Sequence, residues 1–229
     1  MKAIILAGGY GSRLSEYTKK IPKPMVKINK VPILVHIINH YIKYGVTDFF
    51  IASGYKHHVI KSYFEKNFFE ARIRVVNTGL NSLTALRIKK LQKYFKRNEN
   101  FFLTYGDAVS DINLKKLFLF HIKSKKIATL TCVHPPARFG ELIIKKNSVS
   151  KFIEKPQLQE GWINGGFFVI NAKIFSYLKR NKNEMFERGT IQKIIKSKNL
   201  NAFKHDGFWM CMDTLRDKLL LEKSINNFL

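Results

Sequence analysis

The strongest constraint on the fold is the regular alternation between short apolar runs and segments whose apolar residues recur at helical spacing. Lys2–Leu6 is an apolar run that leads into glycines, and Val31–Tyr44 then carries apolar residues three and four positions apart. The same alternation continues as strands Asp48–Ala52, Ile73–Asn77 and Phe101–Tyr105 and helices His58–Phe64 and Leu83–Phe95. Strands that alternate with helices predict a largely parallel sheet with helices on both faces.

The second half of the chain has more closely spaced strands. After a helix at Leu114–Lys123, the pattern predicts strands Ile127–Val133, Glu141–Ile144, Val149–Ile153 and Trp162–Ile170, then helices near Ile174–Leu178 and Glu187–Lys196. Short connections between strands indicate antiparallel pairing and a second lobe at the end of the sheet. We therefore expect an α/β, Rossmann-like fold with a mixed, mostly parallel sheet, in one domain spanning residues 1–229.

Composition sets limits on the surroundings of the chain. Its 229 residues, of which 45% are hydrophobic, suffice for one sizeable core. The apolar runs are far shorter than the roughly 20 residues of a membrane span, so we expect no membrane partner and a cytoplasmic location. Cys132 and Cys211 lie in no zinc-like spacing, and we expect both to be reduced and packed.

The formal charge of +25 makes a polyanionic partner the first alternative to consider. The lysines, however, are scattered without aromatic interleaving or a nucleic-acid-binding motif, in the stretches Lys19–Lys30, Lys89–Lys96, Lys115–Lys126 and Lys145–Lys151. We expect no nucleic acid to bind, although a basic nucleic-acid-binding protein stays the alternative of another class. A basic field also attracts nucleotides and phosphorylated small molecules.

A glycine-rich segment, Leu6–Leu14, follows the first strand at the edge where open α/β sheets bind ligands. Its glycines let backbone N–H groups approach a phosphate or a base. The spacing fits neither the dinucleotide fingerprint nor the P-loop. The predicted nucleotide-binding residues of this segment are Leu6, Ala7, Gly8, Gly9, Gly11 and Ser12.

Two cations accompany this segment. Arg13 ends the glycine-rich stretch, and Lys23 lies between prolines that hold its backbone extended. A lone lysine between prolines is usually a surface residue, but the presence of Arg13 and the glycines in the same stretch of sequence favours phosphate binding. We predict Arg13 and Lys23 as catalytic residues.

The motif L-A-G-G-x-G-[ST]-R-L followed by P-K-P resembles the signature of sugar-phosphate nucleotidyltransferases. The chain is also similar, over nearly its whole length, to the glucose-1-phosphate cytidylyltransferase branch of that family. The segments that carry this similarity are Tyr105–Asp107, Pro135–Leu142, Glu154–Pro156, Trp162–Phe168 and His205–Lys218. The resemblance implies a nucleotide-binding part at about residues 1–125 and an acceptor-binding part at about 126–229.

Two acidic residues are the predicted metal ligands. Asp107 and Asp213 each follow an apolar stretch, where two carboxylates can share a hard cation with phosphate oxygens. Either residue alone is more often a turn or helix-cap residue. We expect Mg²⁺, with Mn²⁺ as the alternative ion.

The resemblance assigns two further groups of residues. The segment that reads the base would include Thr78, Gly79, Ser82 and Thr84, with Gly106 beside it, although a loop and a helix cap explain the same residues. The acceptor would lie against Glu141, Glu154, Lys155, Asn164 and Gly166. The structural alternative is an exposed ion pair for Glu154 and Lys155, and a β-bulge for Asn164 and Gly166.

The predicted reaction is transfer of CMP from CTP to a small phosphorylated acceptor, with release of pyrophosphate. The chain is shorter than the cytidylyltransferases it resembles, by a segment between Phe69 and Val75, and it has Thr84-Ala85-Leu86-Arg87 where they tend to have Thr-Gly-Gly-Arg. It is similar to shortened members of the branch in bacterial capsule pathways, which implies L-glutamine phosphate as acceptor and CDP-L-glutamine as product. A sugar 1-phosphate such as glucose 1-phosphate, or phosphocholine, with CTP or UTP, is the alternative, and the oligomeric state stays open.

Overall fold

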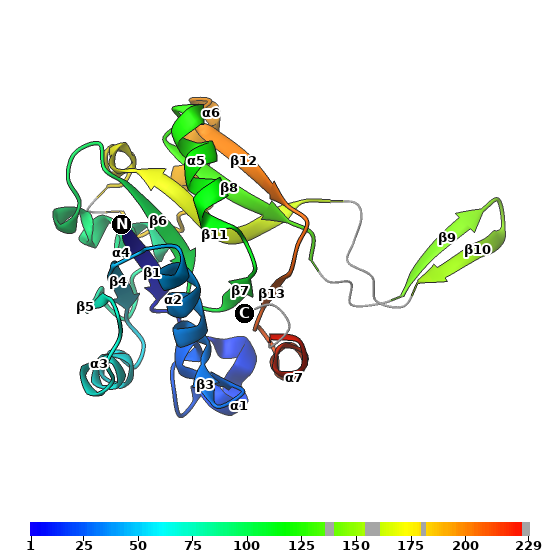
Figure 1. Ribbon diagram of the computed structural model, residues 1–229, viewed down its shortest axis with the longest axis horizontal. Coiled ribbons are helices and arrows are strands. Elements are labelled where there is room, and N and C mark those ends of the chain that lie inside the picture. The colour runs from blue at the N-terminus through cyan, green and yellow to red at the C-terminus, as the bar shows by residue number, and fades with distance from the viewer. Residues whose placement is uncertain (136–139, 154–160, 180–181, 226–229) are drawn as a thin grey trace.

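A seven-stranded sheet forms the centre of the molecule (Figure 1). The computed structural model describes residues 1–135, 140–153, 161–179 and 182–225, apart from the side chain of Glu141. Along the sheet the strands are β12 (Leu200–His205), β8 (Ala128–Val133), β11 (Ile163–Asn171), β6 (Asn100–Tyr105), β1 (Lys2–Ala7), β4 (Asp48–Ser53) and β5 (Arg72–Asn77). All neighbouring pairs are parallel except those of β11, which runs antiparallel to β6 and to β8. The expected mixed, mostly parallel sheet is therefore confirmed.

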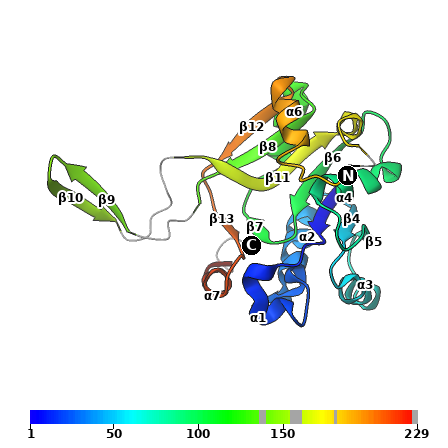
Figure 2. The ribbon, with the colours of Figure 1, turned by 180° about the vertical axis from the view of Figure 1, so that it is seen from behind.

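Helices cover both faces of this sheet (Figures 1 and 2). The α-helices are α1 (Ser15–Thr18), α2 (Ile33–Lys43), α3 (His57–Lys66), α4 (Thr84–Lys90), α5 (Leu114–Ser124), α6 (Thr190–Lys196) and α7 (Leu215–Ser224). Short 3-10 helices are η1 (Ser12–Leu14), η2 (Lys23–Met25), η3 (Gln92–Tyr94) and η4 (Ala172–Ser176). Three two-stranded sheets complete the fold: β2 (Lys27–Ile28) with β3 (Val31–Pro32), β7 (Ala108–Ser110) with β13 (Trp209–Cys211), and β9 (Glu141–Lys145) with β10 (Ser148–Ile153).

The two faces of β1 enter two different cores. Ala3 and Ile5 belong to the core under α2, α3, α5 and α7, whereas Ile4 and Leu6 belong to the core under α4 and α6. Successive side chains of a strand point to opposite faces, so a strand buried on both sides must be apolar throughout. This explains why the first strand reads as a continuous apolar run.

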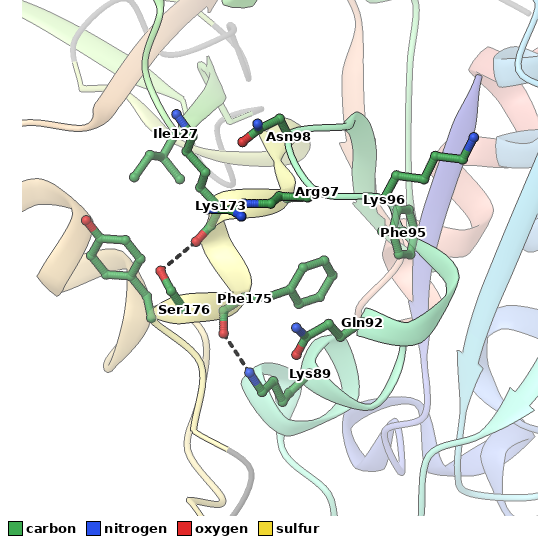
Figure 3. A pocket seen from close by; sticks show the side chains of 12 residues that line it. Lys89, Gln92, Phe95, Lys96, Arg97, Asn98, Ile127, Lys173, Phe175 and Ser176 are labelled. Carbon is green, nitrogen blue, oxygen red and sulfur yellow. Dashed lines mark hydrogen bonds between the residues drawn. The ribbon is translucent and has the colours of Figure 1, made fainter.

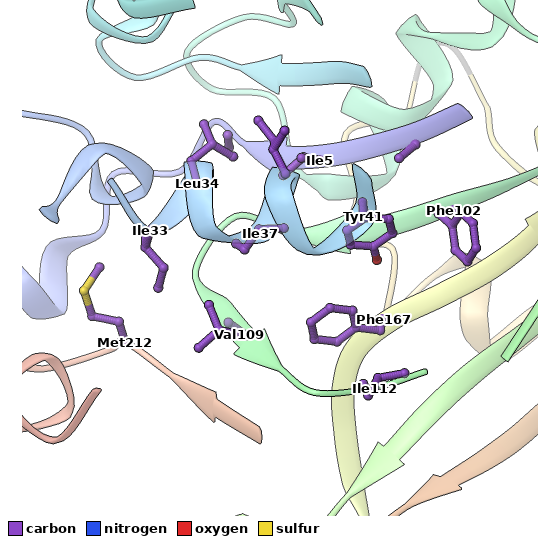
Figure 4. Close-up of a cluster of buried hydrophobic side chains, with 14 of the residues drawn as sticks. Ile5, Ile33, Leu34, Ile37, Tyr41, Phe102, Val109, Ile112, Phe167 and Met212 are labelled. Atoms are coloured by element: carbon purple, nitrogen blue, oxygen red, sulfur yellow. The ribbon is translucent and has the colours of Figure 1, made fainter. Parts of the chain in front are cut away.

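Tyr41 on α2 is the centre of the first core. Its ring stacks on Phe167 of β11, with centroids 6.2 Å apart, and meets Phe102 of β6 edge to face (Figure 4). Aromatic pairs of this kind stabilise a fold beyond the area they bury. The contact holds α2 across the strands whose far ends carry the candidate site.

Several expected boundaries were wrong. The helix expected at Val31–Tyr44 begins only at Ile33, because Val31–Pro32 is a strand that pairs with Lys27–Ile28. The helix expected at Leu83–Phe95 is divided into α4 and η3, and that expected at Ile174–Leu178 is the 3-10 helix η4. The pattern of apolar residues predicts neither β12, at the edge of the sheet, nor α7.

The β9–β10 hairpin stands away from the rest of the molecule (Figures 1 and 2). Its two strands pair with each other in a sheet of their own. Apolar side chains on it are exposed, with Ile144 60% and Phe152 62% accessible. An isolated two-stranded hairpin is marginally stable in water.

Two smaller expectations concern cysteines and membrane spans. Cys132 and Cys211 are both unpaired thiols. Across the described ranges, 1–135, 140–153, 161–179 and 182–225, each helix is too short or too polar to traverse a bilayer.

Candidate active site

The site forms where β1 and β6 end side by side. The two strands are parallel, with Leu6 opposite Tyr105, so the residues that follow them emerge at the same edge of the sheet. The Gly106 backbone N–H donates to the Leu6 carbonyl oxygen at 3.0 Å. A Cβ at Gly106 would lie 3.1 Å from that oxygen, so the close approach favours glycine. The glycine-rich segment after β1 therefore lies next to Asp107.

Asp213 reaches the same edge through the β7–β13 pair. Met210 lies opposite Val109 in this antiparallel ladder, and the Met212 N–H donates to the Asp107 carbonyl at 2.9 Å. The ladder thereby brings together the two aspartates that the sequence had indicated from opposite halves of the chain.

Lys23 lies between the two carboxylates. Its Nζ is 2.6 Å from Asp107 Oδ2 and 2.6 Å from Asp213 Oδ1, and Arg13 Nη1 lies 2.8 Å from Asp213 Oδ2. Burial opposes the charge of Lys23, but the charges and hydrogen bonds of Asp107 and Asp213 outweigh it, so the Lys23 pKa is raised. Lys23 is therefore a cation at neutral pH, and Arg13, mostly exposed, faces the solvent beside it.

A hollow of about 240 Å³ lies over these residues. Its lining includes Leu6, Ala7, Gly9, Gly11, Ser12, Arg13, Lys23, Pro24, Gly106 and Asp107. Gly11 has φ +66°, and a Cβ there would lie 2.8 Å from the Lys23 Cβ, so the turn requires glycine. Except for Gly8, every residue predicted from the glycine-rich segment lines this hollow with both predicted catalytic cations.

A second hollow, of about 510 Å³, continues from the first toward α4 and β11. Gly8, Ser82, Thr84, Asn164 and Asp213 all line it. Predicted nucleotide-side and acceptor-side residues therefore share one continuous depression.

Thr78 and Gly79 follow β5 and form a loop, which is the alternative that the sequence left open for them. The Thr78 side chain is buried, and its hydroxyl donates to the Ser53 carbonyl at 2.6 Å. Gly79 has φ +96°, a left-handed turn that favours glycine. The Ser82 hydroxyl donates to the Thr78 carbonyl at 2.5 Å. These contacts fix the shape of the loop, and the base-reading role of the segment stays a prediction.

Arg87 is the residue that sequence reasoning missed. Its guanidinium is buried and donates to the carbonyl oxygens of Gly8, Ser53, Gly79 and Leu80 and to the Thr78 hydroxyl. Burial lowers the Arg87 pKa. A Cβ at Gly8 would collide with the guanidinium. One side chain thus ties together the ends of β1, β4 and β5, and the only sequence signal was its place in the segment Thr84–Arg87.

On the acceptor side, β11 is irregular where Asn164 and Gly166 lie. The register with β8 shifts between Asn164 and Phe168, so the β-bulge left open by the sequence is present. Gly166 has φ +79°, and its N–H donates to Asn164 Oδ1 at 2.8 Å. Glu154 and Lys155 lie outside the described residues, and so does the side chain of Glu141, which begins β9.

The carboxylates of Asp107 and Asp213 fit a hard divalent cation. They converge on one point that is now taken by the Lys23 ammonium, at 2.6 Å from each. Mg²⁺ is commonly bound by one or two carboxylates together with substrate phosphates, and does not need a full set of protein ligands. Among the residues that the structure describes, there is accordingly no cluster of three or more His, Cys, Asp or Glu side chains with the geometry of a metal site.

A larger cavity, of about 1050 Å³, lies elsewhere (Figure 3). Its lining includes Phe95, Asn98, Lys173 and Phe175, near the start of β6 and thus at the end of the strand opposite Asp107. Lys89 Nζ donates to the Phe175 carbonyl at 2.6 Å across one wall (Figure 3). The lining of this larger cavity includes none of the predicted site residues. The candidate site is therefore identified by the chemistry of its side chains and not by the volume of its cavity.

The comparisons with known proteins identify the family of the chain. The nucleotidyl transferase family model matches residues 2–219. The chain is 43% identical over 244 residues to a glucose-1-phosphate cytidylyltransferase of Salmonella typhimurium, covering 97% of this chain and 95% of the relative. It is 37% identical to a probable glucose-1-phosphate cytidylyltransferase of Bacillus subtilis, covering 99% and 96%.

Solved structures share the fold. HddC from Yersinia pseudotuberculosis matches with a TM-score of 0.74 at 24% identity, covering 98% of this chain and 99% of that chain. A putative glucose-1-phosphate thymidylyltransferase from Bacillus anthracis matches with a TM-score of 0.74 at 22% identity, covering 100% and 96%. The chain belongs to the nucleotidyl transferase family and is a nucleotidyltransferase of its glucose-1-phosphate cytidylyltransferase-like branch.

Proposed function

We propose that the protein transfers CMP from CTP to a small phosphorylated acceptor and releases pyrophosphate. The observation that carries this proposal is the cluster of Lys23, Asp107, Asp213 and Arg13 at the mouth of the glycine-rich loop. Two cations and two carboxylates at one sheet edge suit a triphosphate and a divalent metal. The 43% identical relative supports CTP as the nucleotide.

The proposed chemistry is an in-line displacement at the α-phosphorus of CTP. An oxygen of the acceptor phosphate forms the new bond to that phosphorus, and the bond to the bridging oxygen of the β-phosphate breaks. The attacking oxygen is already ionised at neutral pH, so no general base is needed, and positioning and charge neutralisation remain. Lys23 would bind the α-phosphate, and Arg13, on the open side, would bind the pyrophosphate as it leaves.

Asp107 and Asp213 would hold Mg²⁺, or Mn²⁺ as the alternative. When bound, the ion supplies charge neutralisation at the phosphates. Binding would require Lys23 to move from its present place between the carboxylates, which frees its ammonium for the nucleotide.

A sugar 1-phosphate is the acceptor class that the relatives support, since two of them are named for glucose 1-phosphate.

L-Glutamine phosphate is the second candidate acceptor. A hollow of about 360 Å³ beside Asp213 is lined by the apolar side chains of Ile163, Trp209 and Met210 and by polar ones, among them Thr214, Arg216 and Asp217. This lining is compatible with either acceptor, because hydroxyl and carboxylate groups can bind sugar hydroxyls and a guanidinium can pair with the α-carboxylate of an amino acid. The acceptor therefore needs a direct test.

The test is pyrophosphate release with Mg²⁺, crossing CTP, UTP, ATP and dTTP with glucose 1-phosphate, phosphocholine and a stable mimic of glutamine phosphate. Turnover with CTP and a sugar phosphate would support the first acceptor, and turnover confined to CTP and the glutamine-type acceptor would support the second. Absence of turnover with every pair would contradict the proposed reaction.

A further inference from the structure

The segment from Asn183 to Glu187 is bound along the start of α4 by a series of hydrogen bonds. Asn183 Oδ1 accepts from the Leu83 N–H at 2.7 Å, and Asn183 Nδ2 donates to the Asn81 carbonyl at 2.9 Å. The Ala85 N–H donates to the Glu184 carbonyl at 3.2 Å. Two of these contacts use the Asn183 amide and the third joins two backbone groups, so none of them depends on Glu187.

Glu187 extends this junction into the site. Its carboxylate accepts a short hydrogen bond from the Tyr105 hydroxyl through Oε1 and a 3.2 Å hydrogen bond from the Thr84 hydroxyl through Oε2. The Thr84 hydroxyl in turn accepts from the Phe186 N–H at 2.7 Å. One carboxylate therefore contacts both the helix that follows the predicted base-reading loop and the strand that leads to Asp107.

Tyr105 transmits this contact to the acceptor side. Its ring lies against Gly166, where an added Cβ would come within 2.5 Å of Tyr105 Cδ2, and Asn164 Nδ2 lies 3.4 Å from its hydroxyl. Tyr105 also directly precedes Gly106 and Asp107.

We propose that Glu187 is a positioning residue that fixes Tyr105, and through it the Asn164–Gly166 bulge and Asp107, for acceptor binding and transfer. This inference rests on the proposed function. Glu187 is not expected to touch the substrate. It acts by holding the Tyr105 ring against Gly166 of the bulge.

The hydrogen bonds predict an asymmetric effect. The loop at Asn81–Thr84 keeps its contacts to Asn183, Glu184 and Phe186 when Glu187 is changed. The Tyr105 hydroxyl, in contrast, loses its carboxylate partner and keeps a neutral amide oxygen, a weaker acceptor, beside the long contact to Asn164. The loss should therefore fall on the acceptor and on turnover, and should leave nucleotide affinity nearly unchanged.

The experiment compares Glu187→Gln, Tyr105→Phe and the double variant in the full chain. With whichever acceptor the unaltered protein uses, we expect each single variant to raise the acceptor KM and to lower kcat, giving a loss of about 10–100-fold in kcat/KM. CTP affinity, measured by calorimetry without acceptor, should stay within about twofold. The double variant should lose little more than either single variant, because contacting residues of one network are not additive.

The matched control is Glu184→Gln, the same substitution three residues earlier on the same segment. The Glu184 carboxylate pairs with Lys182 at 2.6 Å and with Lys193 at 3.6 Å, two lysines that do not line the hollows of the candidate site, so the kinetics of the variant should match those of the unaltered protein. Unchanged kinetics in Glu187→Gln would overturn the proposal. A fall in CTP affinity as large as the rise in acceptor KM would also overturn it, because such a fall would indicate that the whole site had become less ordered. If the unaltered protein itself has no turnover, the proposed function has failed instead.

Discussion

The glycine-rich edge of the sheet and the β9–β10 hairpin are built in opposite ways. At the edge, the ends of three parallel strands are joined by the buried Arg87, and Lys23 is held between two carboxylates. The hairpin pairs only with itself and exposes Ile144 and Phe152. On the proposed function, we expect the transfer chemistry to depend on the glycine-rich edge and the choice of acceptor to depend on elements of the antiparallel side.

The largest effect should come from removing one carboxylate at the rigid edge. We predict that Asp107→Asn lowers kcat by about 10²–10³-fold, because it removes charge that would hold the metal near the phosphates. The amide can still accept a hydrogen bond from Lys23, so the melting temperature should change little. Pyrophosphate release and a thermal melt measure the two quantities.

Asp206→Asn serves as the control for this substitution. The Asp206 side chain is 80% exposed and pairs with His134 at 3.7 Å, outside the site. Its activity should equal that of the unaltered protein. Full activity in Asp107→Asn would remove Asp107 from the metal site and with it the main support for the mechanism.

The next largest effect should come from Arg87, which tests whether the rigidity of the edge matters for nucleotide binding. Arg87→Lys keeps the charge but cannot supply the fork of donors, and so leaves buried carbonyl groups unpaired. We expect a loss of about 2–4 kcal/mol in the free energy of unfolding and a CTP affinity at least tenfold weaker. Denaturant titration and calorimetry measure these changes.

Arg74→Lys provides a matched surface control. Arg74 is well exposed and lies 3.9 Å from Asp48, so the same substitution there should change the free energy of unfolding by less than about 0.5 kcal/mol. If Arg87→Lys proved as mild as this control, the guanidinium would not be what holds the three strand ends together.

Local sequence patterns predicted the glycine-rich edge of the sheet better than they predicted the side chains that hold this edge in place. The apolar run before the glycines and the two aspartates after apolar stretches located the site, because strand period and sheet topology suffice to bring Leu6 and Tyr105 side by side. Arg87 could not be recognised, since a cation on a short helix reads as solvent-exposed until the loops around it are placed. The same applies to Glu187, whose partners lie far away in sequence. The strand β12 was not predicted from the sequence, because it is a half-exposed edge strand whose apolar and polar residues do not alternate regularly.

A pH-dependent effect on stability should be smaller, for each histidine and each pH unit, than the loss in Arg87→Lys, and it should arise in the body of the molecule. Burial lowers the pKa of His40 and of His121 to about 4. Between pH 6.5 and 4 the unfolded chain therefore binds protons on these side chains that the folded chain does not. The free energy of unfolding should fall as pH falls through this window, by up to about 1.4 kcal/mol per pH unit for each histidine.

Denaturant titrations between pH 7 and 5 measure this dependence, and His121→Gln separates one contribution. The His121 ring contacts the Thr129 hydroxyl at 2.9 Å, a partner that an amide can also engage. In the variant, the free energy of unfolding should depend less steeply on pH, by the contribution of one histidine proton. An unchanged slope would mean that His121 is protonated in the folded protein or contributes nothing to the linkage.

The smallest effect on stability is expected at the β9–β10 hairpin, where exposed apolar side chains can be compared directly with a buried one. Replacing both Ile144 and Phe152, as Ile144→Thr with Phe152→Ser, should move the melting temperature by no more than about 2 °C, because both side chains are already largely in water. Ile51→Thr in β4 is the buried counterpart. It places a hydroxyl in a fully buried position, so we expect a loss of about 2 kcal/mol, or roughly 4–8 °C.

The kinetics of the hairpin variant decide what its exposed apolar face does. If the hairpin acts only on the acceptor side, the acceptor KM should rise while CTP affinity and the melting temperature stay constant, which is the reverse of the pattern expected for Arg87→Lys. A melting temperature that falls as far as in Ile51→Thr would show instead that the hairpin is packed against protein in solution. The two regions would then be equally rigid, and acceptor choice could no longer be attributed to a freely standing element.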